Sequence, residues 1–200
     1  MKNIHEYKKK EHQKMMLTPL IEESKITLLH GESGSGKTMF AIKHLNKNNI
    51  IPLLIDFDDN EDDELKELGL KAENIDGEMF ADDLMNKHSD KKILKDLVLI
   101  IDTWTLFCRY IGKEEIDAIS ILHKLSEEHS ATIIILSHTV AFSGKEDKPD
   151  MDNNVYRHIK SRLYIRRTTL KSSIEYDLII EKLRGYNGTK LLNIRTEKRE

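Results

Sequence analysis

The chain has 200 residues, of which 38% are hydrophobic and 34% charged, and its formal net charge is -3. This composition is typical of a soluble globular domain and excludes a disordered or collagen-like chain. The single cysteine excludes an intrachain disulfide framework, and no apolar run approaches the roughly 20 residues of a membrane-spanning helix.

The first 20 residues are basic, with consecutive lysines from Lys8 to Lys10, but they lack the apolar core of a secretory signal. We therefore expect a cytoplasmic protein with no membrane partner. Residues 1–20 are interpreted as an N-terminal extension, either a solvated tail or a helix that docks on a neighbouring subunit. Residues 21–200 are expected to form one domain, because no internal boundary interrupts the pattern.

A glycine-rich loop follows the extension, between an apolar run and a helical pattern. The stretch HGESGSGKTMF, which begins at His30, matches the pattern G-x-x-x-x-G-K-[ST]. KITLLH before the loop predicts a short buried strand, and the apolar spacing after it predicts a helix. In such a loop the glycines let backbone N–H groups converge on phosphate oxygens at the positive end of a helix.

The motif predicts a role for each residue toward ATP. Lys37 is expected to reach the β- and γ-phosphates, and the Thr38 hydroxyl to coordinate Mg²⁺. A flexible Gly-Ser linker is the alternative, but a linker is not framed so closely by a strand and a helix. The residues predicted to bind the nucleotide are Gly31, Glu32, Ser33, Gly34, Ser35, Gly36, Lys37, Thr38 and Met39.

Three more aliphatic runs follow and predict strands buried on both faces of a parallel sheet. They are residues 49–57, 96–103 and 131–138. Residues 60–96 predict one or two short helices, and residues 114–129 a longer one. The apolar stripe of the longer helix consists of Ile116, Ile119, Leu122 and Leu125. Trp104 and Cys108 are expected in the core, and residues 139–154 in a long loop.

From residue 155 onward the pattern changes to strands joined by short turns. RLYIRR, IEYDLIIEKLR and KLLNIR predict three strands, and GYNG at residues 185–188 is a strong hairpin signal. We therefore expect an α/β fold with a mostly parallel central sheet, flanked by helices, that ends in a C-terminal antiparallel hairpin.

Acidic strand ends complete the predicted site. Asp102 ends the third strand, where phosphate-loop ATPases place the aspartate that holds Mg²⁺, although a strand-end aspartate can also cap a turn. Thr103 follows it, so the carboxylate that orients the attacking water must come from elsewhere. The second strand ends in Asp56, Asp58 and Asp59. We expect this strand beside the phosphate-loop strand, where it would deliver these acids to the γ-phosphate.

This set of motifs resembles the RecA-like ATPases, especially the cores of the RepA and DnaB replicative helicases, over most of residues 20–195. The resemblance implies a RecA-like P-loop fold and an ATPase that uses ATP and Mg²⁺. It implies that Asp58 takes the position of the water-activating glutamate, one methylene shorter, with Asp59 as a substitute. It also implies that His138, at the end of the fourth strand, senses the γ-phosphate.

The C-terminal KLR, with Lys182 and Arg184 two residues apart, resembles the K-x-R before the last hairpin of that family. Residues two apart on a strand point to the same face. The resemblance implies that both side chains reach the nucleotide site of a neighbouring subunit in a homo-oligomeric ring or filament. An exposed basic edge strand that protects against aggregation is the alternative.

Charge is unevenly distributed along the chain. Residues 156–200 hold 12 Lys and Arg against 5 acids, and residues 56–90 hold 3 Lys against 14 acids. A basic pole can follow the phosphates of single-stranded DNA, and opposite poles can attract each other across a subunit interface. The resemblance places DNA-binding loops around residues 110–113 and 139–154, although the acids of the second loop disfavour phosphate binding.

The sequence therefore predicts a RecA-fold ATPase, with possible helicase activity, that acts on single-stranded DNA in replication or recombination. A small P-loop kinase is one alternative, but it would need an arginine-rich lid and has no use for the K-x-R pair. A catalytically weak accessory subunit of a helicase or recombinase is the other, because Asp58 stands in place of glutamate. The histidines show no metal-ligand spacing with the cysteine, so no zinc site is predicted.

Overall fold

A computed structural model describes residues 20, 21, 23, 25–57, 62–85, 97–140, 148–183 and 190–198. Residues 1–19, most of the predicted N-terminal extension, lie outside this range. Asp58, Asp59, Arg184 and the GYNG turn also lie outside it. Within the described ranges, no helix is long and apolar enough to cross a membrane.

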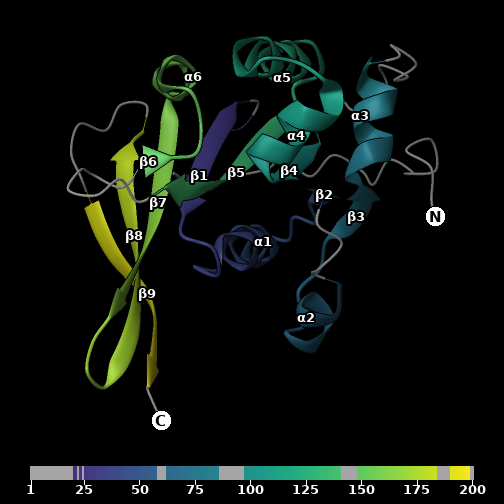
Figure 1. The fold of residues 1–200 in the computed structure, drawn as a ribbon. Helices are drawn as coiled ribbons and strands as arrows, with labels where there is room; N and C mark the ends of the chain where they lie inside the picture. Colours follow the sequence, from purple (N-terminus) through teal and green to yellow (C-terminus); the bar gives the residue numbers. More distant parts are fainter. Residues whose placement is uncertain are drawn as a thin grey trace.

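A single mixed sheet runs through the described chain (Figure 1). Its strands lie in the order β3-β2-β4-β5-β1-β7-β8-β9, and a short β6 pairs with β5. Neighbours from β3 to β7 run parallel, whereas β7–β8 and β8–β9 are antiparallel. The predicted α/β fold with a C-terminal antiparallel hairpin is confirmed. In chain order, the strands are β1 (Ile26–Gly31), β2 (Leu53–Asp56), β3 (Glu73–Asp76), β4 (Val98–Asp102), β5 (Thr132–Val140), β6 (Lys148–Pro149), β7 (Ser161–Thr169), β8 (Ser173–Lys182) and β9 (Lys190–Lys198).

Helices cover both faces of the sheet (Figure 1). One apolar cluster contains residues of α3, α4, α5 and α6, and the cluster on the opposite face contains residues of α1 and α2. Successive strand residues alternate between the two clusters, as Leu28 and Leu29 do in β1. Burial on both faces explains why these strands read as continuous aliphatic runs. The helices are α1 (Lys37–Lys47), α2 (Asp62–Glu67), α3 (Gly77–Met85), α4 (Trp104–Ile111), α5 (Glu115–His129) and α6 (Asn153–His158).

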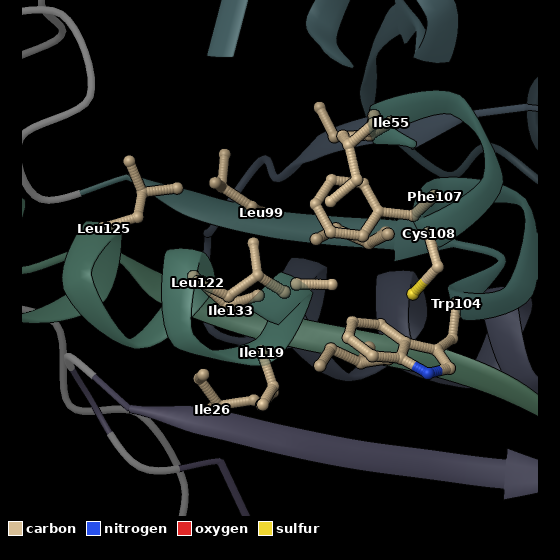
Figure 2. Packing of buried hydrophobic residues seen from close by; sticks show 14 of the residues in the cluster. Ile26, Ile55, Leu99, Trp104, Phe107, Cys108, Ile119, Leu122, Leu125 and Ile133 are labelled. Atoms are coloured by element: carbon tan, nitrogen blue, oxygen red, sulfur yellow. The ribbon is translucent and has the colours of Figure 1, made fainter. Parts of the chain in front are cut away.

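The first cluster confirms the expected core positions of Trp104 and Cys108, which are 0% and 8% exposed. Figure 2 shows the indole of Trp104 near Cys108 and Ile119, among the side chains of the helices that cover this face. The predicted stripe on α5 is right for Ile119, Leu122 and Leu125 but wrong for Ile116, which is 43% exposed. Ala118 is buried instead, because it lies with Ile119, Leu122 and Leu125 on the buried face of α5.

Three further expectations are wrong. Residues 60–96 were expected to hold only helices, but they include the edge strand β3. Ile75 is the one buried residue of this strand, so its sequence contains no aliphatic run. The strand β2 does not lie beside β1, because β4 and β5 separate the two. Residues 110–113, expected in a DNA-binding loop, include the end of α4 and its left-handed cap, Gly112.

Candidate functional site

The loop between β1 and α1 lies at the carboxyl edge of the parallel strands. Gly34 and Gly36 have φ angles of +69° and +80°, in the left-handed region that favours glycine. Apart from the adjoining residues, no heavy atom of the described chain lies within 4 Å of where a Cβ would stand on either residue. The backbone conformation, rather than crowding, therefore requires glycine at these two positions. Gly36 directly precedes α1, so the loop ends at the positive pole of that helix.

The ammonium group of Lys37 is held against this loop. Its side chain is buried, and Nζ donates to the carbonyl oxygens of Gly31 at 3.2 Å and Glu32 at 2.9 Å. A buried charge needs such polar partners to offset the loss of its hydration. The structure thus places the cationic end of Lys37 against the backbone of the loop.

Thr38 and Asp102 meet across the edge of the sheet. The hydroxyl of Thr38, in the first turn of α1, donates to Oδ2 of Asp102, at the end of β4, over 2.7 Å. The two residues are 64 positions apart in the sequence. Hydroxyl and carboxylate oxygens are the kind of ligands that Mg²⁺ prefers. The residues predicted as magnesium ligands are therefore neighbours, and their oxygens fit that ion.

The hydroxyl of Ser35 offers a test of whether the loop fits a phosphate. Ser35 is 3% exposed, and its Oγ makes no hydrogen bond with any residue of the described chain. A buried hydroxyl without a partner costs about 1–3 kcal/mol. An anionic oxygen bound in the loop would supply an acceptor at this point. The loop therefore fits the phosphates of a nucleotide.

Gly31 is packed more tightly than the other glycines of the loop. Replacing it with alanine should destabilise the folded protein by about 1–3 kcal/mol, because overpacking a close contact forces the backbone to shift. The added Cβ would lie 2.6 Å from the carbonyl oxygen of Ile165 and 2.7 Å from Oγ of Ser35. Denaturant unfolding measures the change, with the exposed Ser33→Ala as control. An unchanged free energy of unfolding for Gly31→Ala would contradict this packing.

The acidic end of β2 lies beside the Thr38–Asp102 pair. Asp56 is level with Asp102 on the neighbouring strand, and the amide of Phe57 donates to the carbonyl oxygen of Asp102 at 3.0 Å. Strand alternation directs Asp56 and Asp102 to the same face, the one that α1 covers. The acids predicted to orient water, Asp58 and Asp59, follow directly but lie outside the described residues. They follow a strand that neighbours Asp102 rather than the phosphate-loop strand.

His138 lies on β5, which pairs directly with β1, and it is level with Gly31 in the register. Its side chain is partly buried. The strand continues for two residues beyond it, to Val140, where the sequence predicted a loop. The structure thus brings the predicted sensor to the level of the phosphate loop, one strand away.

Lys182 has a different position. It is exposed at the end of β8, level with Arg162 of β7, which is in turn level with Leu28 of β1. That level is three residues before Gly31, or about 10 Å back along the strand at 3.3 Å per residue. The structure therefore does not bring Lys182 to the phosphate loop of its own chain. Its predicted partner, Arg184, lies outside the described residues.

A buried polar network that the sequence did not reveal lies directly behind the loop. His30, the residue before Gly31, is 0% exposed, and its Nε2 lies 3.0 Å from Oε2 of Glu181. Its Nδ1 lies 3.2 Å from Oγ1 of Thr139, and the hydroxyl of Tyr156 donates to Glu181 at 2.9 Å. His30 and Glu181 are 151 positions apart, so no local pattern could have paired them.

The network sets the charge state of Glu181. Burial alone would raise the pKa of this carboxyl, but the hydrogen bond and charge of His30, the hydroxyl of Tyr156 and the charge of Arg162 outweigh it. The pKa of Glu181 is therefore held below its ordinary value. Glu181 remains a carboxylate, so the ring of His30 faces a negative charge inside the protein.

Comparisons with known proteins identify the fold. No protein-family model matches the chain, and no curated protein matches it. Among solved structures, a KaiC-like protein from the hyperthermophilic archaeon Pyrococcus horikoshii OT3 is similar over 90% of this chain and 92% of that chain. The TM-score is 0.61 and the sequence identity 16%. The chain thus has a RecA-like fold of the KaiC type, and at this identity the likeness concerns the fold alone.

Proposed function

We propose that this protein binds and hydrolyses ATP with the help of Mg²⁺. The observation that carries the proposal is the 2.7 Å contact between Thr38 and Asp102, beside a loop with two left-handed glycines and a buried lysine. A hydroxyl and a strand-end carboxylate in this arrangement are what a phosphate-loop ATPase uses to hold Mg²⁺ on its nucleotide. A capping aspartate alone would not need a threonine hydroxyl as its partner.

The residues of the site divide the work between binding and chemistry. The loop from Gly31 to Met39 binds the phosphates through its backbone N–H groups and Lys37. Thr38 and Asp102 hold the magnesium ion, which neutralises phosphate charge when it is bound. Asp58 orients the attacking water, and His138, level with the loop, senses the γ-phosphate.

We also propose that Lys182 and Arg184 act on the nucleotide of a neighbouring subunit. The exposed position of Lys182, about 10 Å back from the level of its own phosphate loop, supports action between subunits. An active site of this kind is complete only in a homo-oligomer. The opposite charges of residues 56–90 and 156–200 would favour contact between subunits.

Within the RecA-like class, the motifs favour a protein of the RepA and DnaB type that acts on single-stranded DNA in replication or recombination. The basic C-terminal region supports this assignment. The experiment that tests it is the ATPase rate with and without single-stranded DNA, with the molar mass measured alongside. Stimulation by DNA together with assembly supports the assignment. A slow ATPase that DNA leaves unchanged would instead indicate the nucleotide-binding accessory subunit.

Two acids separate the binding of magnesium from the chemistry. Asp58→Asn should leave Mg²⁺–ATP binding near normal but slow hydrolysis by roughly 10²-fold or more, because the amide cannot accept a proton as a carboxylate does. Asp102→Asn should instead weaken the dependence of ATP binding on Mg²⁺. Titration of a fluorescent nucleotide at several Mg²⁺ concentrations, beside single-turnover hydrolysis, measures both effects.

The neighbouring Asp59→Asn serves as the matched control. Normal hydrolysis by Asp58→Asn together with slow hydrolysis by Asp59→Asn would move the role to Asp59. If both variants hydrolyse ATP as the wild type does, a non-catalytic nucleotide-binding subunit becomes the better account.

A further inference from the structure

The buried network around His30 connects three parts of the molecule that the proposed function uses separately. His30 precedes the first residue of the phosphate loop, and Thr139 follows His138 on β5. Glu181 precedes Lys182 on β8. The imidazole of His30, the hydroxyl of Thr139 and the carboxylate of Glu181 thus lie next in sequence to the loop, to the predicted sensor and to the predicted finger, respectively.

The network is built to hold this geometry. The ring of His30 stacks on Tyr164 of β7, with centroids 4.8 Å apart and an angle of 10° between the planes. Tyr156 of α6 meets the same ring edge-on at 6.3 Å, and the guanidinium of Arg162 lies 4.2 Å from the centroid of Tyr156. The stacked contact with Tyr164 and the edge-on contact with Tyr156 restrict the plane of the imidazole, so its two nitrogens stay directed at Thr139 and Glu181.

The contact between His30 and Glu181 is not part of the backbone pairing of the sheet. Replacing both partners of such a polar contact by apolar side chains of the same shape can be nearly neutral for stability. Strand β7 lies between β1 and β8, so backbone pairing does not join the loop strand to the finger strand directly. The His30–Glu181 contact crosses β7 and joins them by side chains alone.

We propose that His30 and Glu181 couple occupation of the phosphate loop to the position of β8, and thereby position Lys182 for the nucleotide of the next subunit. This inference rests on the proposed ATP binding and on the proposed action of Lys182 between subunits. His30 and Glu181 are positioning residues, because each acts through a neighbour in the chain and not on the nucleotide.

The test is hydrogen–deuterium exchange of the wild type and of Glu181→Gln, each with Mg²⁺ and a non-hydrolysable ATP analogue. The two proteins are compared in the same oligomeric state, which is checked by molar mass. Glutamine keeps the size of the side chain but removes the charge that faces His30. In the wild type, nucleotide should slow exchange in residues 31–38 and in the part of β8 near Lys182. In Glu181→Gln the protection of the loop should remain, and the protection of β8 should fall by about tenfold, as expected for loss of a charge-assisted hydrogen bond.

Glu175→Gln is the matched control, because it makes the same chemical change on the same strand outside the network. It should keep both protections. If Glu181→Gln folds poorly in thermal unfolding, Tyr156→Phe replaces it, since it removes the hydroxyl that donates to Glu181 and should lower the protection of β8 in part.

The outcomes separate this inference from the proposed function. If nucleotide fails to protect residues 31–38 in the wild type, ATP binding is wrong and the coupling falls with it. If the loop is protected but β8 is not, or if β8 stays protected in Glu181→Gln, only the coupling is wrong.

Mixing of variants supplies a second measure of the same coupling. A mixture of Glu181→Gln and Lys37→Ala should recover ATPase activity, because the first variant supplies an intact loop and the second an intact finger. A mixture of Glu181→Gln and Arg184→Ala should not recover activity, because the only finger present is the displaced one of Glu181→Gln. Recovery with Arg184→Ala equal to that given by Glu175→Gln would overturn the positioning role.

Discussion

Lys37→Ala should lose most of its ATP affinity and its turnover, because the change deletes the cation that we propose to bind the β- and γ-phosphates. Hydrogen bonds to charged groups contribute about 1.5–3 kcal/mol each, so affinity should fall by roughly 10- to 100-fold or more. Titration with a fluorescent ATP analogue measures the affinity, and phosphate release measures the turnover.

The structure provides the control for this experiment. Lys43→Ala removes an exposed lysine from the same helix and should leave binding and turnover unchanged. Lys37 also donates to two carbonyl oxygens of the loop, so thermal unfolding of both variants must show that the fold persists. Wild-type affinity and turnover in a folded Lys37→Ala would remove the phosphate-loop assignment.

Arg184→Ala should lose turnover by roughly 10³–10⁵-fold while it still binds ATP, because an arginine finger contributes rate enhancements of that size in phosphoryl transfer. If the finger acts between subunits, turnover per subunit should also rise with protein concentration as interfaces form. Steady-state ATPase assays over a range of concentrations, with molar mass measured in parallel, test both statements.

The decisive form of this experiment mixes Arg184→Ala with Lys37→Ala. Neither variant is active alone, but a mixed interface can pair the intact loop of the first with the intact finger of the second. Recovery of activity on mixing supports action between subunits. A monomer that is fully active at every concentration would mean that Lys182 and Arg184 belong only to a basic edge, and the proposed ring or filament would be wrong.

The parts of the fold that the sequence could predict are those whose determinants lie close together in the chain. The phosphate loop was predicted because residues 31–38 contain its glycines, lysine and threonine in one run. The buried strands were predicted because helices cover both faces of the sheet, and residues on both faces of each strand are therefore mostly aliphatic. The pairing of Thr38 with Asp102 followed from the motif that joins them.

The parts that the sequence could not predict depend on tertiary contacts. The strand β3 needs only Ile75 in the core because it lies at the edge of the sheet, so its sequence carries no aliphatic signal. The position of β2 in the sheet was predicted wrongly, because the pairing of distant strands leaves no pattern in the local sequence. The contact of His30 with Glu181 spans 151 positions, and each residue taken alone reads as an ordinary strand residue.

The burial of Trp104 has a practical consequence for spectroscopy. The chain contains one tryptophan, which is buried in the core, and its indole N–H donates to the partly buried Glu115 at 2.9 Å. It follows Asp102 by two residues, so the emission of a single chromophore arises next to the proposed magnesium aspartate. A change in emission maximum or lifetime when Mg²⁺ and nucleotide are added can be assigned to this place without labels. The same signal, shifted to the red on exposure to water, follows unfolding of the variants described above.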